Sequence, residues 1–142
     1  MKILYALFAL LPFSAFAVTD SCAVPGSSVE MDMTRGVSKD LGLKAITPPK
    51  MELLAVAPVG KALADQYAKA DRAADLARKS GHSLGYEDYF SSYYDNGAKT
   101  LLIQYTYENA AKQKNIFVAS SLVNDDECSI RFNGYVTLQR EY

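Results

Sequence analysis

Histidine, cysteine and tryptophan are nearly missing from this sequence, which has one histidine, two cysteines and no tryptophan among 142 residues. These counts exclude a zinc site made of four cysteines, or of two cysteines and two histidines. The sequence also lacks a glycine-rich phosphate loop. We therefore expect no metal, no cofactor and little scope for catalysis by a nucleophile and a histidine.

An excess of charge of either sign is also missing. Fifteen Lys and Arg stand against sixteen Asp and Glu, for a formal net charge of −1. Proteins that bind nucleic acid need a basic surface to neutralise phosphates. We expect no nucleic-acid partner.

Long apolar runs are absent except at the start of the chain. Residues 3–13 are almost entirely apolar and follow Lys2, and Ala15 and Ala17 provide the small residues of a cleavage site. This pattern is typical of a secretory signal peptide over residues 1–17. We expect an exported protein, periplasmic or secreted, without stable membrane insertion after cleavage.

The expected export determines how the two cysteines are interpreted. In an oxidising compartment an even pair, Cys22 and Cys128, favours a disulfide over two free thiols. Neither residue lies in a Cys-x-x-Cys motif, which argues against redox catalysis. We expect the bridge to fix the N-terminal arm to the last strand.

The N-terminal part of the expected mature chain, residues 18–50, is rich in Gly, Ser, Pro and Thr and ends at Pro48-Pro49. We expect an irregular arm with at most one short strand near residues 29–33. Residues 51–142 then form a single domain. Periodicity leaves open whether residues 51–57 are a strand or part of the following helix.

A long helix is predicted from Pro58 to Ser80, because proline is tolerated in the first turn of a helix. Its apolar residues recur every three or four positions and predict a stripe that packs on a sheet. They are Val59, Leu63, Tyr67, Ala70, Ala74 and Ala77.

Three strands are predicted by period-two alternation over residues 99–107, 115–123 and 128–139. In the last strand Phe132, Gly134, Val136 and Leu138 are expected on the inner face. Short polar connectors favour antiparallel neighbours. The expected class is α+β, with one long amphipathic helix and a short tyrosine-rich helix packed on a three- to four-stranded antiparallel meander.

The tyrosine-rich helix provides the candidate binding site. Its residues Tyr86, Tyr89, Tyr93 and Tyr94 combine large contact areas with polar tips, as rings at recognition surfaces do. Packing within the domain is the alternative explanation. Since consecutive helical residues point about 100° apart, Tyr93 and Tyr94 cannot both face the core.

Small size, the excess of tyrosine and the scarcity of histidine and cysteine favour a non-enzymatic module that binds another protein, such as an inhibitor or an immunity protein. One alternative is a small hydrolase or isomerase using Glu87, Asp88 and His82 as acid-base groups. A structural subunit of an envelope assembly is another. The sequence does not specify the oligomeric state.

Overall fold

The computed structural model describes residues 21–42, 48–78 and 83–142. The elements, in chain order, are α1 (Ser28–Leu41), β1 (Lys50–Pro58), α2 (Lys61–Arg78), α3 (Tyr86–Tyr93), β2 (Lys99–Glu108), β3 (Lys114–Val123) and β4 (Arg131–Arg140). All four strands form one antiparallel sheet in the order β1-β2-β3-β4, so the expected α+β meander is confirmed. The expected signal peptide lies outside the described residues.

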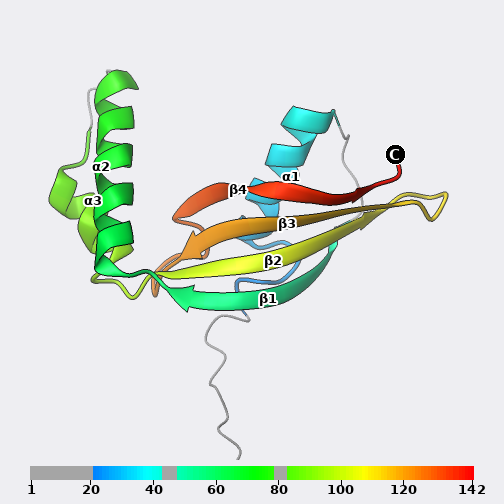
Figure 1. The fold of residues 1–142 in the computed structure, drawn as a ribbon, viewed down its shortest axis with the longest axis horizontal. Helices are drawn as coiled ribbons and strands as arrows, with labels where there is room; N and C mark the ends of the chain where they lie inside the picture. Colours follow the sequence, from blue (N-terminus) through cyan, green and yellow to red (C-terminus); the bar gives the residue numbers. More distant parts are fainter. Residues whose placement is uncertain (1–20, 43–47, 79–82) are drawn as a thin grey trace, which may run out of the picture.

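The main core lies between α1 and one face of the sheet, and α1 passes behind the sheet in Figure 1. Alternation on β2 sends Leu101, Ile103, Tyr105 and Tyr107 to this face, where all four are buried, as predicted. Phe117 of β3 lies opposite Tyr105 in the register and joins them.

The first helix corrects the expectation of an irregular arm with a short strand at residues 29–33. Val29, Met33 and Val37 are spaced four apart, share one face of α1 and are buried against the sheet. The many Gly and Ser residues of this segment concealed that spacing. Gly42 ends the helix with φ of +66°, a left-handed conformation that glycine adopts readily.

A disulfide joins Cys22 to Cys128 with a Cα–Cα distance of 5.2 Å, which confirms the predicted pairing. Cys22 precedes α1 and is buried in the main core, while Cys128 lies in the connection between β3 and β4. The bridge therefore fixes the beginning of α1 to the far end of the meander.

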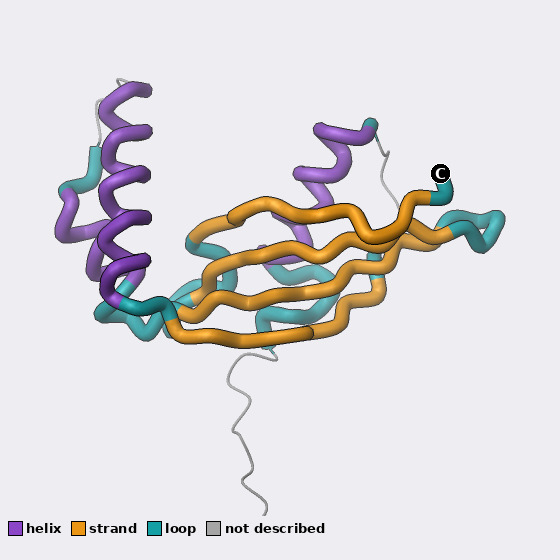
Figure 2. The backbone as a smooth tube through the Cα atoms, viewed as in Figure 1, coloured by secondary structure: helices purple, strands orange, loops and turns teal. Residues whose placement is uncertain are grey.

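The predicted long helix is in fact a strand followed by a shorter helix. Residues 51–57 belong to β1, and Pro58, expected to begin the helix, pairs with Lys99 at the end of that strand. Of the expected apolar stripe, Val59 and Tyr67 pack in a core, but the rest is wrong: the buried residues of α2 are Ala64 and Ala68, while Leu63 is exposed. Figures 1 and 2 show α2 beside one end of the sheet instead of across it.

The inner face predicted for the last strand is also wrong beyond Phe132. Ser120 pairs with Gly134 but Ser121 pairs with Phe132, so β4 contains one extra residue at a bulge. The extra residue reverses the alternation and turns Tyr135 toward α1 along with Phe132. Val136 and Leu138 are each 60% exposed.

Candidate functional site

Helices α2 and α3 pack against each other through polar side chains. Three tyrosine hydroxyls of α3 donate hydrogen bonds to three aspartate carboxylates of α2; the pairs are Tyr86 with Asp65, Tyr89 with Asp75 and Tyr93 with Asp71. Between the helices lies a small second core that includes Ala64 and Ala68. The tyrosine rings of α3 pack against this core, and their hydroxyls add hydrogen bonds to α2, so the same side chains provide both apolar and polar contacts in this helical hairpin.

The environment of these tyrosines keeps their hydroxyls protonated. The hydrogen bond to Asp65 raises the pKa of Tyr86 to about 12. Burial, assisted by the hydrogen bond to Asp71, raises the pKa of Tyr93 to about 12. On the acceptor side, the contacts with Lys69 and then Tyr86 lower the pKa of Asp65. The donors therefore remain donors, and the Asp65 acceptor remains ionised, at neutral pH.

A pH dependence of stability follows from the raised pKa of Tyr93. Below pH 10 the Tyr93 hydroxyl is protonated in both the folded and the unfolded states, so its full contribution to the free energy of unfolding is present. That contribution is lost as the pH rises toward about 12, the pKa of Tyr93 in the folded state. We expect the difference in unfolding free energy between the parent and Tyr93→Phe to fall over this interval. Asp71 keeps its Arg131 partner in the variant. Urea unfolding at a series of pH values measures the difference, and a constant difference up to pH 12 would contradict the assignment.

The first residue of β4 connects the hairpin to the sheet. The Arg131 guanidinium lies 2.5 Å from Asp71 and 4.6 Å from the ring centroid of Tyr67, combining an ion pair with a cation–π contact. Asn133 adds a 3.3 Å hydrogen bond to the Tyr67 hydroxyl. The hairpin is therefore held in place by β4 as well as by its own connections to β1 and β2.

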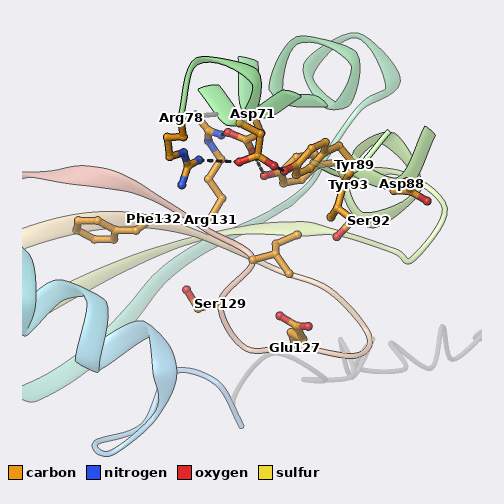
Figure 3. Close-up of a pocket in the computed structure, with 13 residues that line it drawn as sticks. Asp71, Arg78, Asp88, Tyr89, Ser92, Tyr93, Glu127, Ser129, Arg131 and Phe132 are labelled. Atoms are coloured by element: carbon orange, nitrogen blue, oxygen red, sulfur yellow. Dashed lines mark hydrogen bonds and ion pairs between the residues drawn. The ribbon is translucent and has the colours of Figure 1, made fainter. Parts of the chain in front are cut away.

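A groove of about 640 Å³ lies beside the hairpin, between α2, α3 and the start of β4 (Figure 3). Ile130, Phe132 and Leu84 contribute apolar surface to it. Its charged groups are four carboxylates and two guanidiniums, those of Asp71, Asp75, Asp88, Glu127, Arg78 and Arg131.

Most of the charged groups in the groove already have partners within the protein. Arg78 contacts Asp75 at 3.0 Å, and Arg131 pairs with Asp71. Asp88 accepts a 2.9 Å hydrogen bond from the backbone N–H of Gly85 at the start of α3. These side chains position the helices, which leaves fewer groups available to transfer protons to or from a substrate.

One side of α3 and its C-terminal cap carry a row of neighbouring rings, which we call the aromatic stripe: Tyr86, Phe90 and Tyr94. Tyr86 and Phe90 also pack against the second core. Adjacent ring centroids are 5.8 and 5.4 Å apart, as the i, i+4 spacing on a helix predicts. Tyr94 is 43% exposed, and the other two rings are partly exposed. Phe90 was not among the residues selected from the sequence, although its spacing from Tyr86 and Tyr94 was the signal for the stripe.

The structure separates the four tyrosines singled out from the sequence. Tyr93 is only 3% exposed and Tyr94 is 43% exposed, which confirms that the two rings point to different environments. Tyr86 and Tyr89 are partly buried against α2. Tyr94 is thus the member of the set with most surface available to a partner.

Two of the three suspected acid-base residues, Glu87 and Asp88, border different hollows. Glu87 borders a shallow hollow with Lys61, whereas Asp88 borders the large groove. His82 lies outside the described residues. Within the described ranges, no three His, Cys, Asp or Glu side chains gather closely enough to hold a metal ion.

Comparisons with protein-family models, curated proteins and solved structures found no match to this chain. Among the described residues, no helix has the length and apolar composition needed to cross a membrane.

Proposed function

We propose that this protein is an exported, non-enzymatic module that binds another protein through the aromatic stripe on α3. The observation that carries the proposal is the exposed Tyr94 ring, which contacts the Phe90 ring and lies outside both cores. Aromatic side chains that keep large exposed areas are the usual anchors of protein interfaces. An inhibitor or immunity protein, whose partner is an exported enzyme or toxin, is the most concrete form of this function.

Export is supported by two independent features. The chain begins with the charge, apolar run and small residues of a signal peptide. The bridge between Cys22 and Cys128 closes a separation of 106 residues, and such structural disulfides persist in oxidising compartments.

The helical hairpin suits the presentation of a binding surface. The aspartate and arginine contacts fix α3 on α2 and on β4, so the stripe is held in one orientation before binding. A pre-ordered surface loses less conformational entropy on association than a mobile one. The groove on the other side of α3 would admit a loop of the same partner.

Site-specific crosslinking tests the proposal. A photoreactive phenylalanine analogue at position 94 should capture one protein in the exported fraction of the native cell, and the same analogue at position 76 on α2 should not. Leu76 is a matched position because it is helical and 59% exposed.

The captured partner then permits a quantitative prediction. Tyr94→Ala should weaken its binding tenfold or more, the effect of losing about 1.4 kcal/mol, while the melting temperature changes little because the ring is exposed. Titration calorimetry measures the affinity, and Leu76→Ala is the control. An affinity unchanged by both Tyr94→Ala and Phe90→Ala would show that the stripe is not the binding surface. Tyr93→Ala is a poor test, since loss of a buried ring lowers stability.

A further inference from the structure

The face of the sheet opposite α1 carries a second apolar surface, which we call the open sheet face. Its centre consists of Leu102, Val118 and Val136, which the alternation and register of β2, β3 and β4 place on one side, and the exposed Leu54 and Leu138 lie at register shifts of the two edge strands. Leu102 is 37% exposed and Val136 is 60% exposed. In Figure 1 this face is turned to the viewer, with α2 and α3 at one end only.

The centre of this face carries no charge. The residues of β2 and β3 that point to it between Thr100 and Thr106 and between Ile116 and Leu122 are aliphatic side chains, threonines, a serine and a glutamine. In contrast, 22% of the residues in the whole sequence are charged. The charged residues Lys50 and Glu52 lie on the edge strand β1, opposite Thr106 and Gln104 in the register. The uncharged centre can therefore lie against an identical centre without repulsion between like charges.

The dimensions of the face match a second sheet better than a single helix. Four strands about 4.8 Å apart, with ten residues of about 3.3 Å each, give roughly 600 Å² in projection. A docked helix about 10 to 12 Å wide would cover roughly half of that width. Two such faces together would bury roughly 1,200 Å², the lower end of the range for specific interfaces.

We propose that the open sheet face binds a second copy of this chain, forming a two-fold dimer in which two four-stranded sheets pack face to face. Sheets pack about 10 Å apart with their strand directions nearly aligned, and the inner side chains form the core between them. The modest area makes the dimer weak and dependent on concentration. The proposal is independent of the aromatic stripe, which lies on α3.

Sedimentation of the disulfide-bonded protein over a range from 1 to about 500 μM tests this proposal. We expect a reversible monomer–dimer equilibrium with a dissociation constant in the micromolar range. Val136→Lys and Leu102→Lys should each weaken dimerisation at least tenfold, because the two-fold symmetry introduces each buried charge twice. The control is Leu76→Lys. Leu76 lies on α2 and is as exposed to solvent as Val136, so this variant should leave the equilibrium unchanged.

Each other outcome overturns the proposal. A monomer at every concentration would mean that the face is left open or binds a different protein. A dimer that is unaffected by both face variants, or that is lost in Leu76→Lys, would place the interface elsewhere. Circular dichroism of each variant at the lowest concentration checks its fold. Val136 lies on the edge strand β4 and is 60% exposed, so its variant remains informative if Leu102→Lys does not fold.

Discussion

Phe117→Ala should lower the free energy of unfolding by roughly 3 to 5 kcal/mol, the range for a large aromatic residue removed from a core. Phe117 is 0% exposed at the centre of the main core. Its ring makes edge contacts with Tyr107 and Tyr135, at centroid distances of 5.9 and 5.4 Å. The loss therefore combines burial, aromatic contacts and a cavity that the surrounding sheet fills only in part.

Phe132→Ala is the matched control for this prediction. The pattern of β4 placed Phe132 on the inner face, which the structure confirms, and its ring is partly buried there beside Gly36 of α1. We expect a loss of roughly 2 kcal/mol, because less of the ring leaves water on folding. Urea unfolding with the disulfide intact measures both variants. A loss for Phe132→Ala equal to or greater than that for Phe117→Ala would refute this view of the core.

The contrast between these residues shows where sequence patterns are reliable. The face of β2 was predictable because the strand is regular and one of its two faces is fully buried, so period two appears directly in the residue types. On β4 the same reasoning failed after a bulge, since one extra residue reverses the assignments that follow it until the second register shift, next to Leu138. Gly134, with φ of +106°, marks the bulge, but a glycine within a strand does not by itself show which residue is extra.

Composition and spacing gave conflicting information about the helices. In α1 the spacing of Val29, Met33 and Val37 was informative, but the surrounding Gly and Ser residues favoured an irregular segment. In α2 the spacing of Leu63 was misleading, because the face that packs on α3 is made of alanines and aspartates. An aspartate on a helix normally indicates a solvent-exposed face. Here three of them accept hydrogen bonds from tyrosines.

The candidate site was predictable only in part. The aromatic content of residues 86–94 indicated the correct helix, and the geometry of consecutive residues separated Tyr93 from Tyr94. The roles of Asp71 and Arg131 were not predictable, since their ion pair joins positions 60 residues apart. Pairings of this kind depend on tertiary structure, and no local pattern specifies them.

Removing the disulfide should produce the second large effect. Chain-entropy arguments give roughly 4 to 5 kcal/mol for a loop of the 106-residue separation closed by Cys22 and Cys128. We expect Cys22→Ala/Cys128→Ala to lose roughly 3 to 5 kcal/mol and roughly 10 to 20 °C in melting temperature. Alanine is preferred to serine because Cys22 is buried among apolar residues, where an unpaired hydroxyl would add a separate penalty.

The double cysteine variant should lose stability mainly around α1 and not uniformly over the protein. The bridge holds the beginning of α1 against the connection before β4, where Ser129 also donates a 2.5 Å hydrogen bond to Asp32 of α1. Amide hydrogens of α1 should therefore exchange faster in the double variant under native conditions, whereas those between α2 and α3, held by the tyrosine–aspartate bonds, should change less. A stability loss below about 1 kcal/mol, or faster exchange confined to α2 and α3, would show that the bridge does not stabilise the packing of α1 on the sheet.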